Sequence, residues 1–124
     1  MTFKALVVTG VLLLVFCSQL LADDPASANR EVIVHILRAV TMKAQLYYHT
    51  PASEHGGGGS FATLGLNQLV LIPATAYGYV VLTSPRATSV TLTGVGRELG
   101  YDGSNLVEVE IIVYPDSVNM TIIN

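Results

Sequence analysis

The residue types that could do chemistry gather in one stretch, "YYHTPASEHGGGGSF", which contains histidines, an acid and a run of glycines. A glycine-rich loop binds phosphate when it follows a strand, opens a helix and ends in Lys-Ser or Lys-Thr. Here Gly56, Gly57, Gly58 and Gly59 follow a segment of helical periodicity, and no lysine comes next. Nucleotide binding is therefore not expected, and the glycines are predicted to let the chain reverse between a helix and a sheet.

Three side chains in the same stretch, His49, Glu54 and His55, are of types that bind metal ions. Their spacing matches no compact ligand motif, so a solvated loop is the preferred interpretation. A metal-dependent enzyme at these residues remains the third and least favoured hypothesis.

Two acids farther along, Glu108 and Glu110, stand two residues apart in the alternating run "NLVEVEIIVY". This spacing places both carboxylates on one face of a strand, where such a pair could suggest acid/base chemistry. A charged solvent face explains the pair more simply. No G-x-S-x-G elbow or recognisable Ser-His-Asp set occurs, so a non-catalytic protein without a cofactor is expected.

The composition narrows the function classes further. The chain has 124 residues, of which 51% are hydrophobic and 12% are charged, and its net charge is −3 at pH 7. This length suits one domain, and the acidic balance offers no basic face for nucleic acid. Cys17 is the only cysteine in the sequence, which excludes a disulfide framework within the chain.

The chain begins with an uncharged apolar stretch, residues 5–22, which follows Lys4 and is bounded by Asp23 and Asp24. This layout is typical of a secretory signal peptide cleaved after Ala22. An uncleaved membrane anchor is the alternative, because the stretch is at the short edge of what spans a bilayer. In either case residues 23–124 are predicted to form one exported domain in the periplasm, at the cell surface or outside the cell.

A long helix is predicted next, with Asp24 as its N-cap and Pro25 in its first position. Thr50 precedes a proline and is expected to end it. Apolar residues three and four positions apart form one core stripe, made of Ile33, Ile36, Leu37, Val40 and Ala44.

Four strands are predicted within residues 75–84, 87–96, 105–114 and 117–124, after a short helical turn around Leu66. Short connections favour an antiparallel meander. Val118, Met120 and Ile122 are expected to point inward, and Thr91, Thr93, Glu108 and Glu110 to face solvent. The expected fold class is α+β, a long N-terminal helix packed on a four-stranded antiparallel β-meander.

The order of these pieces resembles the globular part of type IV pilin-like and pseudopilin-like proteins. The resemblance rests on "YYHTPASEHGGGGSF", "YGYVV", "VTLTGVGRELGYDG" and "VEVEIIVYPDSVNMTIIN", and it covers roughly residues 44–124. It implies a structural junction between helix and sheet made of Tyr47, Tyr48, Pro51, Gly56, Gly57, Gly58, Gly59 and Phe61.

The N-terminus departs from the pilin pattern, in which a peptidase cuts after glycine and glutamate stands fifth in the mature chain. Here the cut would fall between Gly10 and Val11, and the fifth residue would be Val15. Asp23, Asp24 and Pro25 would also interrupt a continuous assembly helix. The departure puts the usual filament-core contacts in doubt.

The resemblance implies an exported structural or interaction subunit of an extracellular filament or secretion-type assembly. Its partners would be other pilin-like subunits or further copies of itself, with membrane anchoring possible through residues 5–22. The alternative is a soluble periplasmic or secreted module that binds a peptide, a glycan or a small ligand. Aromatic contacts would then come from Tyr47, Tyr48, Tyr77, Tyr79 and Tyr101.

Overall fold

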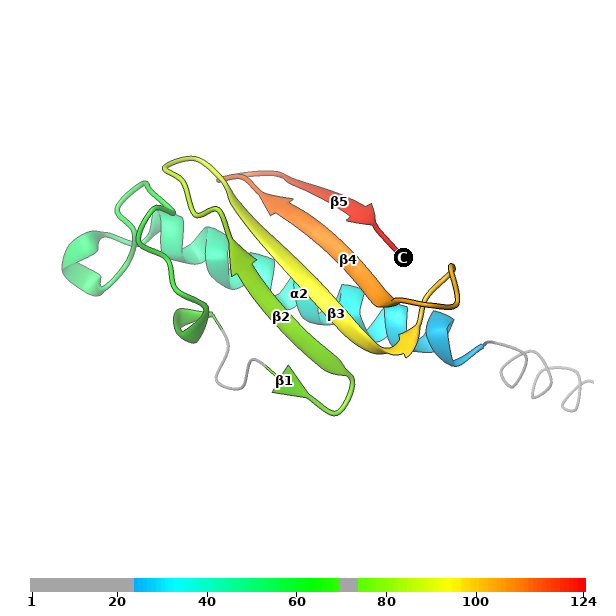
Figure 1. Ribbon diagram of the computed structural model, residues 1–124. Helices are drawn as coiled ribbons and strands as arrows, with labels where there is room; N and C mark the ends of the chain where they lie inside the picture. The colour runs from blue at the N-terminus through cyan, green and yellow to red at the C-terminus, as the bar shows by residue number, and fades with distance from the viewer. Residues whose placement is uncertain (1–23, 70–73) are drawn as a thin grey trace, which may run out of the picture.

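The computed structural model describes residues 24–69 and 74–124 (Figure 1). The interpretation of residues 1–22 as a signal peptide or anchor lies outside these ranges. Within them, no helix combines the length and the apolar character needed to cross a membrane.

Helix α2 spans Pro25–His49, as the sequence predicted. The Asp24 carboxylate accepts the N–H of Ser27 at 2.6 Å, and Pro25 occupies the first turn, where its missing N–H leaves no hydrogen bond unmade. At the other end Thr50 adopts an extended backbone before the proline. The helix is therefore stopped at both ends by local chemistry.

One stripe of α2 faces the core. Ile33, Leu37 and Ala44 are fully buried and Val40 nearly so, whereas Ile36 is half-buried. Successive helical residues point about 100° apart, so Leu37 takes the centre of the stripe and Ile36 lies at its edge. Ile36 therefore packs against the buried cluster from the edge of the stripe.

The sheet contains β1 (Ala74–Thr75), β2 (Gly78–Thr83), β3 (Val90–Leu99), β4 (Leu106–Val113) and β5 (Val118–Ile122). These strands lie side by side in chain order, and each neighbouring pair is antiparallel. The predicted four-stranded meander is confirmed as β2 to β5, and β1 adds a two-residue strand beside β2. Two short 3-10 helices, η1 (Ala52–Glu54) and η2 (Leu66–Gln68), lie between α2 and the sheet in the sequence.

Helix α2 packs across β3 and β4 on one face of the sheet (Figure 1). The strand residues under it are completely buried: Val90 and Leu92 on β3, and Val107, Val109, Ile111 and Val113 on β4. No described element lies over the opposite face, which carries the predicted outward residues Thr91, Thr93, Glu108 and Glu110. The molecule is thus a two-layer α+β fold with one bare sheet face.

The inward orientation predicted for β5 is confirmed, but the inner side of this strand is only partly covered. Val118 and Ile122 share the sheet face that α2 packs on, because they are opposite the buried Val113 and Val109. They are nevertheless 47% and 43% exposed, and Met120 between them is half-buried. Helix α2 lies over β3 and β4, so these side chains point to the inner face without being covered.

Candidate functional site

The glycine run closes the C-terminal end of α2. The backbone N–H groups of Gly57 and Gly59 donate to the carbonyl oxygens of Tyr47 and Tyr48, each at 2.8 Å, and Gly58 donates to Thr50 at 2.9 Å. These carbonyls belong to the last helical turn and its cap, which lack partners within a helix. Because the glycine N–H groups are engaged in this way, they do not form an open cradle for phosphate.

Gly57 and Gly59 illustrate two different reasons for a glycine in this run. A Cβ at Gly57 would overlap the carbonyl oxygen of Ser60 and crowd the ring of Tyr47. Gly59 has open space around it but a φ of 86°, which L side chains rarely adopt. Across the run, Gly56 and Gly57 make close approaches to other backbone atoms, whereas Gly58 and Gly59 have left-handed backbone.

Aromatic packing completes this junction. The Phe61 ring is fully buried, and its centroid lies 4.8 Å from that of Tyr48. The Phe61 N–H donates to the carbonyl oxygen of Ala87, which precedes β3, and the Tyr47 hydroxyl lies 2.8 Å from that of Thr63. The junction joins helix to sheet, and its side chains are engaged in packing.

The proposed metal ligands are not brought together. Across residues 24–69 and 74–124, no three His, Cys, Asp or Glu side chains are placed to hold a metal ion. Glu54 and His55 are exposed on η1 and its cap, whereas His49 reaches the β4–β5 turn.

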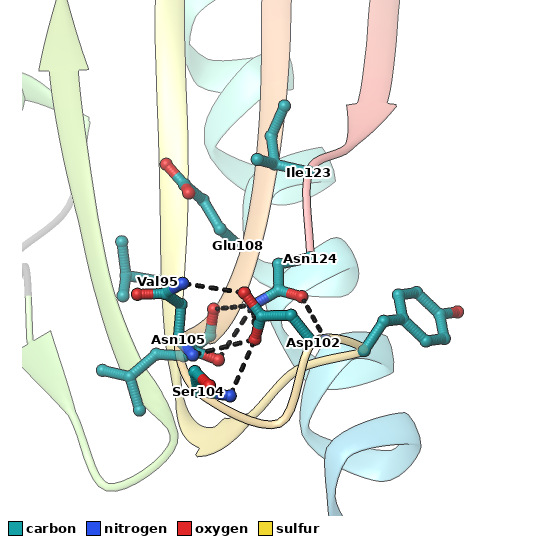
Figure 2. A pocket seen from close by; sticks show the side chains of 9 residues that line it. Val95, Asp102, Ser104, Asn105, Glu108, Ile123 and Asn124 are labelled. Carbon is teal, nitrogen blue, oxygen red and sulfur yellow. Dashed lines mark hydrogen bonds between the residues drawn. The ribbon is translucent and has the colours of Figure 1, made fainter.

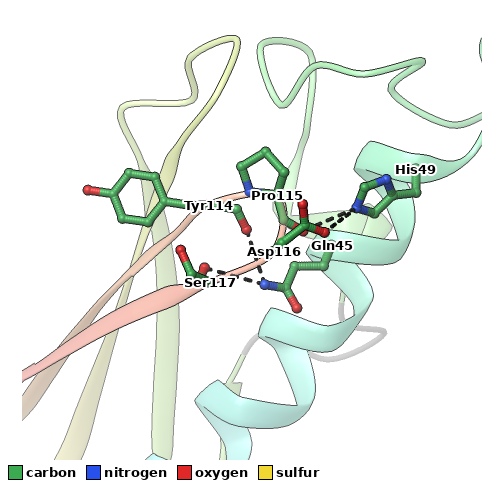
Figure 3. A network of polar contacts seen from close by, with 6 residues as sticks. All are labelled: Gln45, His49, Tyr114, Pro115, Asp116 and Ser117. Carbon is green, nitrogen blue, oxygen red and sulfur yellow. Dashed lines mark hydrogen bonds and ion pairs between the residues drawn. The ribbon is translucent and has the colours of Figure 1, made fainter.

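That turn is held against α2 by a small polar network (Figure 3). His49 Nε2 lies 3.2 Å from both the Pro115 carbonyl oxygen and an Asp116 carboxylate oxygen. Both neighbours are acceptors, so this nitrogen carries the proton. Gln45 donates from its amide to the carbonyl oxygens of Tyr114 and Ser117, at 3.1 and 3.4 Å. The network fixes the start of β5.

A second network fixes the other end of β5 (Figure 2). The Asn124 amide donates to the carbonyl oxygens of Asn105 and Leu106 at 2.8 and 3.1 Å, and its oxygen accepts the N–H of Asp102 at 3.1 Å. Glu108 exchanges backbone hydrogen bonds with Asn124 at 3.1 Å. Asn124 is thereby buried, and it ties the end of β5 to the β3–β4 loop.

Asp102 organises that loop. Its carboxylate accepts the backbone N–H groups of Asn105 and Ser104, at 2.8 and 2.9 Å, and the side-chain amide of Asn105 at 2.7 Å. These donors hold the pKa of the Asp102 carboxyl well below its ordinary value. Beside the loop, on the bare sheet face, lies an open hollow of about 770 Å³ lined in part by Val95, Glu108 and Ile123.

Sequence reasoning missed Asn29, which lies four residues before Ile33 on the same helical stripe. Its side-chain oxygen accepts the N–H groups of Arg97 and Glu98, at 2.9 and 3.3 Å, where the β3–β4 register shifts. Its amide donates to the Tyr77 carbonyl oxygen at 2.7 Å. The signal available was a polar residue at the spacing of the apolar stripe, which predicts a buried side chain with backbone partners.

The five tyrosines expected to make aromatic contacts with a ligand are dispersed. Tyr47 and Tyr48 belong to the junction, Tyr77 lies in the β1–β2 turn, and Tyr79 lies on the bare face of β2. Tyr101 lies in the β3–β4 loop, with its ring 3.8 Å from the guanidinium carbon of Arg30. They form no common aromatic surface.

Comparisons with known proteins provide no relative from which to transfer a function. No protein-family model matches the chain, and neither a curated protein nor a solved structure is significantly similar to it. The functional argument therefore rests on the surfaces described above.

Many of the polar side chains with described contacts hold turns and loops, and exposed apolar side chains occur on α2, on several strands and in the turns. Strand β5 offers the clearest surface, because it is fixed at both ends and lies at the sheet edge. Val118 and Ile122 line its inner side and Ile123 follows on the outer side, all of them 43 to 50% exposed. Contiguous exposed apolar surface is a common feature of sites at which proteins bind other proteins.

Proposed function

We propose that the chain is an exported, non-catalytic, pilin-like subunit that binds other protein chains within an extracellular filament or secretion-type assembly. The observation that carries this proposal is the open β5 edge with its exposed apolar row, Val118 and Ile122. Unpaired strand edges recruit further strands, and exposed apolar rows contribute affinity when they are covered.

The architecture supports the same proposal. A long helix packed on an antiparallel meander is the arrangement that the resemblance to pilin-like proteins implies. The glycine junction supports it by joining helix to sheet through hydrogen bonds and buried aromatic packing, which gives a rigid unit suited to assembly.

The test is fractionation of the native cell envelope. We expect the chain in a high-molecular-weight fraction that mechanical shearing releases, with its apolar segment retained, so that mass spectrometry finds the chain starting at Met1 or Val11. A chain found solely as a free monomer starting at Asp23 would overturn the proposal.

The alternative is a soluble secreted binding module, and the hollow beside Asp102 favours it. Its lining includes the acids Asp102 and Glu108 together with Tyr101, a composition that suits a polar ligand such as a glycan. A monomer starting at Asp23 that binds glycans on an array, and loses binding in Tyr101→Ala, would select this function.

A further inference from the structure

Strand β5 lacks the usual protections of an edge strand. Its residues Val118–Ile122 include no charged side chain and no proline, and its pairing with β4 runs without a register shift. Natural edge strands are commonly protected by lysine, proline or a bulge, which discourage pairing with another chain. The free edge of β5, on the side away from β4, is visible in Figure 1, and no described strand pairs with it.

The backbone groups that face outward can be assigned from the hairpin. Tyr114 N–H donates to the Ser117 carbonyl at one end of β5, and Ile123 N–H donates to the Glu108 carbonyl at the other. Hydrogen-bonding direction alternates along an antiparallel strand. Asn119 and Thr121 therefore face β4, whereas the N–H and C=O groups of Val118, Met120 and Ile122 point away from the sheet.

From this pattern we propose that β5 pairs antiparallel with β5 of a second copy of this chain, about a two-fold axis at Met120. In this register Val118 is opposite Ile122 of the copy, and Met120 is opposite Met120. Each such pair joins outward-facing residues, so both of its hydrogen bonds can form. The contact is isologous, as in most protein dimers.

The side chains favour a second copy because the strand is complementary to itself in this register. On the inner face every opposed pair is apolar, and on the outer face Asn119 is opposite Thr121 of the copy. No two like charges meet, although each chain is acidic overall. A slip of two residues toward the start of the strand would place the Asp116 carboxylate opposite Ile122. A slip of one residue in either direction would place the outward N–H and C=O groups of one copy opposite residues whose own groups already bond to β4.

The groove beside the strand adds continuity to this interface. It has a volume of about 550 Å³, lies between α2 and β5, and is lined in part by Met42, Ile111, Val118 and Met120. Met42 is 71% exposed in the single chain. Pairing at β5 would continue this side of the sheet into the second copy and place the two exposed apolar rows side by side.

Disulfide trapping in the native envelope tests the pairing with the full chain. Opposed residues in a hydrogen-bonded antiparallel pair have Cα atoms about 5.5 Å apart, within the about 4.4–6.8 Å that a disulfide spans. In a Cys17→Ser background, Met120→Cys is expected to give a disulfide-linked dimer after oxidation. Leu46→Cys, which is 68% exposed on α2, is the matched control and should give little.

Charge variants test the register. Added to Met120→Cys, either Val118→Lys or Ile122→Glu alone should lower the dimer yield by about tenfold, because each opposes a charge to an apolar side chain. The two together should restore it, because the introduced lysine and glutamate are then opposed across the axis. Restoration also excludes misfolding as the cause of the loss.

The outcomes separate this inference from the proposed function on which it rests. A chain in the assembly fraction without the Met120→Cys dimer overturns the pairing alone, whereas a free chain that still forms the dimer overturns the assembly role alone. A disulfide to a protein of another mass would show a different occupant and overturn pairing with a second copy. Failure of the double variant to restore the dimer would overturn the register.

Discussion

Strands β4 and β5 are hydrogen-bonded neighbours with the same alternation of apolar residues, yet their inner side chains differ in environment. Val109 and Ile111 on β4 are fully buried, whereas Ile122, opposite Val109, is 43% exposed. The difference lies in the position of α2, which packs on β3 and β4.

Alternation of apolar and polar residues along a strand predicts the orientation of side chains but not their burial. The period of two determines which face of the sheet a side chain occupies. Whether that face is covered depends on where another element lies, and nothing in β5 itself records this. The exposed apolar residues of β5 therefore support the intermolecular contact proposed above.

The largest predicted effect tests directly whether inner side chains on β4 and β5 differ in burial. Ile111→Ala should lower the free energy of unfolding by about 2–5 kcal/mol, because it leaves a cavity under α2. Ile122→Ala should cost less than about 1 kcal/mol in the monomer. Urea unfolding at dilute protein concentration measures both. Equal costs would show that β5 is covered in the monomer.

Substitutions in the glycine junction test how firmly the C-terminal end of α2 is held against the sheet. Gly57→Ala should cost about 1–3 kcal/mol of unfolding free energy, because its Cβ overlaps the Ser60 carbonyl and loosens the end of α2. Gly59→Ala is the matched control, since it meets no atoms and should cost about 1 kcal/mol from its left-handed backbone. Thermal unfolding compares the two, and a larger cost at Gly59 would contradict the packing argument.

Most of the fold could be predicted from the sequence, because helix ends and strands are marked by patterns of neighbouring residues. Asp24 and Pro25 mark the start of α2, Thr50 before a proline marks its end, and alternation marks the four longer strands. Strand β1 was missed because two residues carry no periodicity, and its pairing with β2 is made by the β1–β2 turn.

The candidate site was harder to predict from the sequence, because it depends on contacts between residues far apart in the chain. Asn124 meets Asp102 and Asn105, and Gln45 meets the β4–β5 turn, across long sequence separations. Polar residues in loops look alike in a sequence whether they are solvated or engaged in such contacts. The edge itself follows from the meander order, but its anchoring at both ends does not.

A smaller effect concerns the anchor at the end of β5. The lowered pKa of Asp102 means that its carboxylate contributes stability above its ordinary pKa of 3.8 and loses that contribution as the pH falls below it. Asp102→Asn should therefore destabilise the protein at neutral pH, by less than Gly57→Ala, and the difference from wild type should shrink toward about pH 2. Unfolding curves across this range measure it.

The control for that experiment is Glu54→Gln, an exposed acid on η1. It should leave the free energy of unfolding at neutral pH within about 0.5 kcal/mol of wild type, because it is an exposed surface substitution. A constant deficit for Asp102→Asn at every pH would mean that the side chain acts through shape rather than charge.

The smallest predicted effect concerns Gln45, which holds the start of β5 through the β4–β5 turn. Gln45→Ala removes the amide that donates to Tyr114 and Ser117, at an exposed site, and should cost about 0.5 kcal/mol. That loss allows β5 to open locally about twofold more often, so the amides of Asn119 and Thr121 should exchange with solvent faster by that factor. The amides of β4 that face β3 should keep their rates, because α2 still covers that pair of strands. Lys43→Ala on the same helix is the control, and faster exchange in β4 as well would mean that the two strands open as one unit.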